Sequence, residues 1–168
     1  MKPDRFFWIL IFSYLPFFPC FSQSSDIIDS LIKVSKTDLS DQERVDIYNQ
    51  IAYQFDTDSA QVSKYSFAAI NLGTKIEYQE GISIAYDNLA WMSLLTGYFD
   101  TAEKYWNEAL SLAKTSSYWK GEAKAYNGLG LLRQSQGKHS ESVDYFLKSL
   151  KIMEREEYTV GLAPAYNN

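Results

Sequence analysis

The chain has 168 residues, of which 46% are hydrophobic and 22% are charged, and its formal net charge at pH 7 is −5. This length and hydrophobic fraction are enough for one ordinary domain with a sizeable core, which excludes an intrinsically disordered chain. The acidic balance argues against nucleic acid as a partner, because a phosphate-binding surface needs an excess of positive charge.

Residues 1–22 have the three parts of a secretory signal peptide. Lys2 and Arg5 supply the positive charge at the start, and they are followed by the apolar run FFWILIFSYLPFFP. Small side chains three positions and one position before the cut suit cleavage between Ser22 and Gln23. We therefore expect an exported protein, located in the periplasm or the cell envelope after cleavage.

Two alternatives remain for this segment. Cys20 would be the acylated residue of a lipoprotein signal, but Phe18 and Pro19 stand where that signal requires small residues. An uncleaved anchor is the other, although the apolar run is short for a spanning helix, which needs about 20 residues. Cleavage after Ser22 would remove the single cysteine, so the mature chain would form no disulfide.

Residues 23–40 are predicted to form an N-terminal capping helix and a linker. Ile27, Leu31, Ile32 and Val34 recur at helical spacing. Such a helix would cover the stacking face of the first structural repeat that follows.

An internal repeat with a period of 40 residues occupies the rest of the chain. Its clearest copies are GISIAYDNLA from Gly81, GEAKAYNGLG from Gly121 and GLAPAYNN from Gly161. The repeat defines units at 81–120 and 121–160 and the start of a further, truncated unit at 161–168. Because the last unit breaks off, we expect the sequence to be a piece of a longer protein.

A degenerate copy of the repeat precedes these units at 41–80. Tyr48 lies 38 residues before Tyr86, whereas Tyr65 lies 40 residues before Tyr105. We therefore expect the first hairpin turn to be two residues shorter than the later ones.

Each unit is predicted to contain two amphipathic helices, because its apolar and small residues recur at intervals of three and four. A short turn centred on Gly97 or Gly137 would reverse the chain and form an antiparallel helical hairpin. Small residues such as Ala90, Ala102 and Ala109 mark the places where the two helices approach each other.

Residues 41–168 resemble the tetratricopeptide repeat family. The pattern is a small residue after leucine, a glycine before the turn, and then alanine, aromatic and alanine on the second helix. The resemblance implies an all-α fold, a right-handed superhelix of antiparallel helix hairpins. The typical repeat has 34 residues, and we expect the six additional residues to extend the link between units, as in 114–120.

The sequence offers no catalytic, cofactor-binding or metal-binding constellation. The single histidine, His139, falls at a hairpin turn where the family usually has an aromatic residue, so a packing role is expected. The eight glycines follow the repeat and do not cluster as in a nucleotide-binding loop. We therefore predict a protein without a cofactor that is not an enzyme.

The resemblance also implies that the first helices line an inner face that receives an extended peptide or a partner helix. Polar residues recur at two adjacent repeat positions there, and amide groups can both donate to and accept from a peptide backbone. The candidate groove residues are Asn49, Gln50, Asp87, Asn88, Lys124 and Asn127. The alternative is that these side chains bind solvent or a neighbouring helix.

Asn88 and Lys124 also match part of the carboxylate clamp of chaperone-binding members of the family. The first unit carries Asp46 where that clamp needs a basic residue, so we do not infer a clamp.

Two functions from different classes follow from these observations. A signal peptide followed by 40-residue units resembles the extracytoplasmic input region of bacterial sensor kinases and helix-turn-helix regulators. The alternative is a stand-alone exported scaffold for envelope protein assembly. In both cases the chain would meet the membrane only through the signal peptide or a segment beyond residue 168. A glycan-cleaving helical enzyme is a third possibility, supported only by Asp87.

Overall fold

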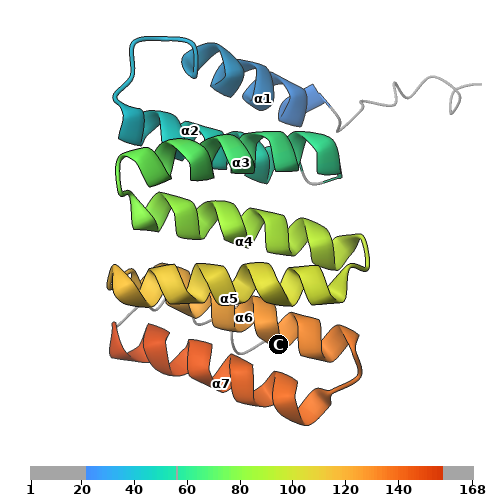
Figure 1. Ribbon diagram of the computed structural model, residues 1–168. Helices are drawn as coiled ribbons and strands as arrows, with labels where there is room; N and C mark the ends of the chain where they lie inside the picture. Colours follow the sequence, from blue (N-terminus) through green and yellow to red (C-terminus); the bar gives the residue numbers. More distant parts are fainter. Residues whose placement is uncertain (1–21, 56, 157–168) are drawn as a thin grey trace, which may run out of the picture.

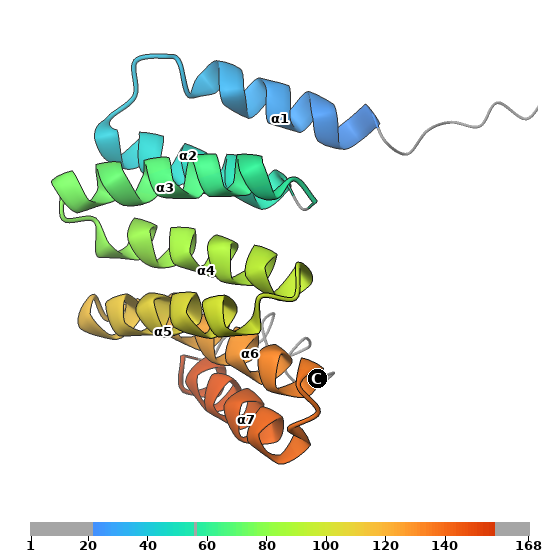
Figure 2. The same ribbon diagram turned by 45° about the vertical axis from the view of Figure 1, so that its right-hand side comes forward.

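The computed structural model describes residues 22–55 and 57–156, which form seven α-helices and no strand. Figure 1 shows the helices stacked in chain order, and Figure 2 shows the same stack turned by 45°. The helices are α1 (Ser22–Val34), α2 (Asp41–Gln54), α3 (Ser59–Lys75), α4 (Gln79–Leu95), α5 (Phe99–Thr115), α6 (Trp119–Ser135) and α7 (His139–Arg155). The predicted all-α fold of helical hairpins is confirmed, with α2/α3, α4/α5 and α6/α7 as the three pairs. The segment from 161 lies outside the described residues.

Helix α1 packs on α2, at the place expected of an N-terminal cap. The Arg44 guanidinium donates hydrogen bonds to the backbone oxygens of Ser35, at 2.9 Å, and Leu39, at 3.3 Å, and so fixes the connection to α2. A capping box starts α2, because Ser40 Oγ accepts from the Glu43 N–H at 3.3 Å while the Glu43 carboxylate accepts from the Ser40 N–H at 2.9 Å.

One type of turn joins the helices from α3 to α7. Residues with positive φ stand every 20 positions, at Glu77 (57°), Gly97 (80°), Ser117 (57°) and Gly137 (73°). In each turn the next residue donates its N–H to a carbonyl five positions earlier, over 2.8 Å. This is the Schellman arrangement, which satisfies the last carbonyls of a helix.

The prediction that the link between units is extended is wrong. The turn between α5 and α6 comprises residues 116–118, which is as short as the turn within a unit at 96–98. Helices α4 to α7 have 17 residues each, so two such helices and two three-residue turns account for the period of 40. The additional residues lengthen the helices because a Schellman turn fixes the length of each connection.

The prediction that the first hairpin turn is shorter is also wrong. Residues 55–58 connect α2 to α3, which makes this connection one residue longer than the turn at 96–98. The shorter offset of the first unit arises in α2 itself, because this helix has only 14 residues. Asp58 then caps α3, because its side chain accepts hydrogen bonds from the backbone N–H groups of Ala60 and Gln61 at 3.1 Å.

The predicted small residues do lie where the two helices of a hairpin touch. Ala90 and Ala102 are fully buried between α4 and α5, and Ala109 is 1% exposed. In the next hairpin, a Cβ added to Gly130 would lie 2.5 Å from the Phe146 ring. The absence of larger side chains therefore sets the close approach of the helices.

Tyrosine pairs establish which residues of the three hairpins correspond. The ring centroids are 6.0 Å apart for Tyr48 and Tyr65, 5.8 Å for Tyr86 and Tyr105, and 6.3 Å for Tyr126 and Tyr145. The first helix of the first unit is therefore offset by 38 residues from its counterpart, and all other helices are offset by 40.

The first helices of successive units lie next to one another. Helix α2 contacts α4, and α4 contacts α6, whereas the second helices of successive units hardly touch within the described residues. Helices α2, α4 and α6 therefore form the inner face of the stack, and α3, α5 and α7 form its outer face. None of the described helices combines the length and the apolar character needed to cross a membrane.

Candidate peptide-binding groove

A groove with a volume of about 690 Å³ runs along the inner face, across α4 from α2 to α6. Its lining comes from the three first helices, from Phe55 directly after α2, and from one residue each of α3 and α5. The lining residues are Ala52, Tyr53, Gln54, Phe55, Val62, Asp87, Asn88, Trp91, Met92, Trp106, Lys124, Asn127, Gly128 and Leu131.

Four of the six predicted groove residues line this groove, namely Asp87, Asn88, Lys124 and Asn127. They come from α4 and α6, and the groove brings them together as the inner-face argument expected. Whether they bind a peptide stays a prediction.

The other two predicted residues, Asn49 and Gln50, do not line the groove. Asn49 is buried, and its Nδ2 donates a hydrogen bond to the Gly81 backbone oxygen at 2.8 Å. The Asn49 backbone oxygen in turn accepts from Asn88 Nδ2 at 3.2 Å. Asn49 therefore joins α2 to α4, as in the alternative given above, and Gln50 is exposed beside it.

An apolar stripe that the sequence analysis missed lines the same groove. Tyr53, Trp91 and Leu131 occupy one repeat position, and the first two are 72% and 44% exposed. This position follows Asn49 and Asp87 by four residues, so it lies on the same face of each first helix. The helical spacing would have identified the stripe from the sequence.

Asp87 and Lys124 are the charged residues of the groove lining. Burial raises the pKa of the Asp87 carboxyl, while the Lys124 charge and a hydrogen bond from Trp106 act in the opposite direction. The indole Nε1 of Trp106 donates that bond to Asp87 Oδ1 at 2.9 Å. The carboxylate is thus held in place by a side chain of the core.

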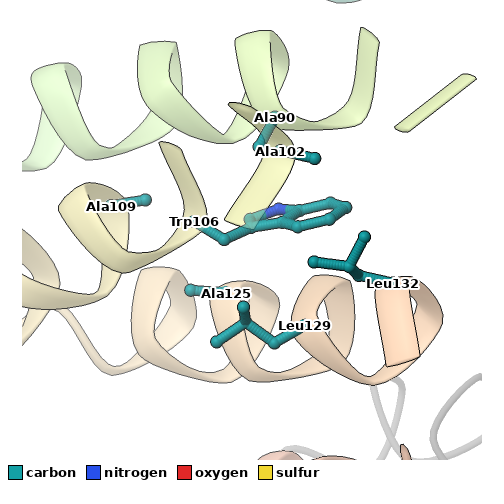
Figure 3. Packing of buried hydrophobic residues seen from close by; sticks show 7 residues of the cluster. All are labelled: Ala90, Ala102, Trp106, Ala109, Ala125, Leu129 and Leu132. Atoms are coloured by element: carbon teal, nitrogen blue, oxygen red, sulfur yellow. The ribbon is translucent and has the colours of Figure 1, made fainter. Parts of the chain in front are cut away.

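Trp106 fills the space between α5 and α6 below the groove. Figure 3 shows its indole ring among Ala90, Ala102 and Leu132, and the side chain is only 1% exposed. The ring needs the glycine at position 128, because a Cβ there would lie 2.2 Å from it. This part of the groove therefore has a rigid, closed floor.

The expected packing role of His139 is wrong. His139 begins α7 and is exposed, whereas its counterpart Phe99 packs partly buried against the core. Within the described residues, no group of three or more histidine, cysteine, aspartate and glutamate side chains could hold a metal ion.

The fold defines a helical-repeat protein with an open groove on its inner face. Residues 81–155 match the family model described as tetratricopeptide repeat, which supports this family for the chain. Such repeats indicate a protein–protein interaction module and are generally non-catalytic scaffolds.

A solved structure with a similar fold is that of BtubC (BKLC) from P. vanneervenii. The TM-score is 0.61 at 19% sequence identity, and the match covers 78% of this chain and 55% of that protein. This chain therefore spans about half the length of that relative, and at this identity the likeness shows the fold alone. No curated protein sequence matches the chain.

Proposed function

We propose that the chain is a non-catalytic module whose groove binds an extended segment of a partner protein. The observation that carries the proposal is that an apolar stripe and a set of polar groups lie together in one open groove. The exposed rings of Tyr53 and Trp91 would contact partner side chains. The Asn127 amide and the charges of Asp87 and Lys124 would then meet the polar groups of the partner backbone.

The direct test is a selection of extended peptides from a random peptide library displayed on phage, with the full chain as bait. Trp91→Ala removes a large ring from the centre of the groove, and we expect it to weaken the selected peptides at least about tenfold. Tyr98→Ala is the matched control, because Tyr98 is 68% exposed but does not line the groove. Failure to select any peptide, or equal effects of the two substitutions, would refute groove binding.

We further propose that the protein is exported and that this region is the extracytoplasmic input of a longer membrane signalling protein. The signal-peptide pattern of residues 1–22 and the 40-residue units support this context. The alternative is a stand-alone exported scaffold for envelope protein assembly.

The reading frame past codon 168 distinguishes the two contexts. Further repeats followed by about 20 apolar residues and a signalling module are expected for the input region. A stop codon after a polar capping helix would refute it and favour the scaffold. Amino-terminal sequencing of the protein from the envelope fraction tests export, for which Gln23 is the expected first residue.

A further inference from the structure

Two rows of mostly charged residues lie beside the apolar stripe on the inner face. In each first helix they precede the stripe by seven and by eleven residues, and these spacings keep side chains on one side of a helix. The rows are Asp46, Ile84 and Lys124, and Gln42, Glu80 and Lys120. All of these side chains are at least partly exposed, so they can meet a segment that lies in the groove.

The charges in these rows change sign along the stack. Asp46 on α2 and Glu80 on α4 are acidic. Both members on α6, Lys120 and Lys124, are basic. Asp87 of the groove lining adds a further carboxylate on α4. The inner face therefore has an acidic end, at α2 and α4, and a basic end, at α6.

At the acidic end the carboxylates lie around two tyrosines. The Tyr78 hydroxyl donates a hydrogen bond to Asp46 Oδ1 at 3.1 Å. Burial raises the pKa of the Tyr118 hydroxyl, and the nearby charge of Glu80 raises it further. Asp87 and Asp46 act on the pKa of Tyr118 in the same direction. Because neither Asp46 nor Glu80 forms an ion pair with a described residue, this end holds negative charge that a partner could neutralise.

The basic end consists of two exposed lysines, Lys120 and Lys124, which stand one turn apart on α6. Lys124 also lines the groove. It attracts the Asp87 carboxylate, but neither lysine forms an ion pair in the part of the chain that the structure describes. The Lys120 ammonium instead lies over the Trp119 ring, 5.5 Å from its centroid. This end is therefore available to acidic side chains of a partner.

A segment that crosses α2, α4 and α6 would meet the two ends one after the other. Packed helices have axes about 8–10 Å apart, so α2 and α6 are separated by about 16–20 Å. An extended chain advances about 3.3 Å per residue. The partner residue opposite Asp46 and the one opposite Lys124 are therefore about five or six positions apart.

We propose that the inner face selects an extended partner segment that carries a basic side chain at the α2 and α4 end and an acidic side chain at the α6 end. The proposal rests on groove binding and specifies it, since the apolar residues between the two charges would contact the stripe of Tyr53, Trp91 and Leu131. A segment that lies in the opposite direction would place like charges together, which is unfavourable. The charges of the inner face therefore set the direction of the partner as well as its composition.

The probe is the tightest peptide from the phage selection, synthesised with blocked ends so that only its side chains carry charge. We expect it to contain a basic and an acidic residue about five or six positions apart, with apolar residues between them. Lys120→Glu combined with Lys124→Glu should weaken its binding about tenfold at low ionic strength, and added salt should reduce the difference. Lys104→Glu combined with Lys151→Glu is the matched control, because these lysines are exposed on α5 and α7, away from the inner face.

A reversed charge in the peptide provides a test that loss of folding cannot imitate. Replacing the acidic residue of the peptide by lysine should weaken its binding to the wild type and strengthen its binding to the Lys120→Glu, Lys124→Glu variant. Glu80→Gln tests the other end, because it should reduce the effect of replacing the basic residue of the peptide but not that of replacing its acidic residue. The expected coupling is about two- to fivefold. Equal affinities of both peptides for both proteins, or coupling of Glu80 to the acidic residue, would overturn the proposal.

Trp91→Ala separates this proposal from groove binding itself. Selected peptides that need Trp91 but lack the charge pattern, or that bind the double lysine variant as well as the wild type, would refute the charge selection and leave groove binding intact. Peptides that respond to the lysine variant but not to Trp91→Ala would refute groove binding and leave the charged rows as the binding site. Failure to select any peptide would refute both.

Discussion

The seam between α3 and α4 and the seam between α5 and α6 use the same two repeat positions in opposite ways. The second seam combines the large Trp106 with Gly128, which leaves room for the ring. The first combines the small Ser66 with the larger Asn88. In each seam a larger side chain on one helix is thus paired with a smaller one on the other helix. The second seam is filled by its own tryptophan, whereas in the first Asn88 donates a hydrogen bond to the Asn49 backbone oxygen at 3.2 Å.

The largest effect is expected from opening the second seam with Trp106→Ser. The substitution removes a side chain that is only 1% exposed and leaves a cavity among the alanines and leucines around it. Loss of a buried tryptophan costs about 3–5 kcal/mol of the free energy of unfolding. Urea denaturation followed by circular dichroism measures the change.

A double variant tests whether the second seam can be packed with the residue pair of the first seam. Adding Gly128→Asn to Trp106→Ser supplies the second seam with the pair that the first seam carries. We expect the double variant to regain part of the lost stability, because the asparagine fills some of the cavity. A double variant less stable than Trp106→Ser would show that the two seams are not interchangeable.

A smaller loss is expected when the second seam is overfilled by Gly128→Ala. The new methyl group would lie 2.2 Å from the Trp106 ring, which is enclosed and cannot move aside. Overpacking costs about 1–3 kcal/mol, and the better helix propensity of alanine offsets up to about 1 kcal/mol of that. The matched variant in the first seam, Asn88→Ala, removes atoms and creates no such contact. A higher midpoint for Gly128→Ala than for the wild type would contradict this view of the seam.

The sequence predicts the hairpins well because the 40-residue period arises from the contacts between helices. Small residues and aromatic pairs recur wherever helices touch, and these positions fixed the offsets of 38 and 40. The repeat pattern did not show which element of the first unit is shorter. A gap of two residues fits a shorter turn or a shorter helix equally well, and only the four-residue connection at 55–58 shows that α2 is shorter.

The groove was predicted in part for the same reason. Asn49 and Asp87 share one repeat position, so the sequence treats them alike. Asn49 bonds to Gly81 of the neighbouring helix, whereas Asp87 bonds to a tryptophan that the first hairpin lacks. Their roles differ because they contact different residues, and a repeat pattern does not show which residues each position contacts.

Two hydrogen bonds between the helices of a hairpin are each expected to contribute about 1 kcal/mol to the free energy of unfolding. Ser83 Oγ donates to the Ala109 backbone oxygen at 2.9 Å between α4 and α5, and Ser149 Oγ donates to the Ala123 oxygen at 2.8 Å between α6 and α7. These are the same two positions with the donor on opposite helices. We expect Ser83→Ala and Ser149→Ala to destabilise the protein equally, by about 0.5–1.5 kcal/mol each.

An exposed serine on α5 provides the control for this pair. Ser111→Ala removes a hydroxyl that makes no contact between helices, so its effect should stay within about 0.5 kcal/mol. If Ser111→Ala lowers the free energy of unfolding as much as Ser83→Ala does, the effect comes from replacing a serine in a helix and not from the hydrogen bond between helices.

The smallest effect is expected from Asp87→Asn, which gives the second hairpin the residue that Asn49 and Asn127 provide in the other two. Because burial raises the pKa of the Asp87 carboxyl, the ionised form is less favourable in the folded protein than in the unfolded chain. Its ionisation therefore lowers the free energy of unfolding as the pH rises from about 4, the value of an unperturbed aspartate, through the raised pKa. Asp87→Asn should slightly raise the urea midpoint at pH 7, and the advantage should vanish below about pH 4. Asp144→Asn, at an exposed position of α7, controls for the loss of one negative charge. A lower midpoint for Asp87→Asn at pH 7 would mean that the attraction of Lys124 outweighs burial, so that the charged pair stabilises this part of the inner face.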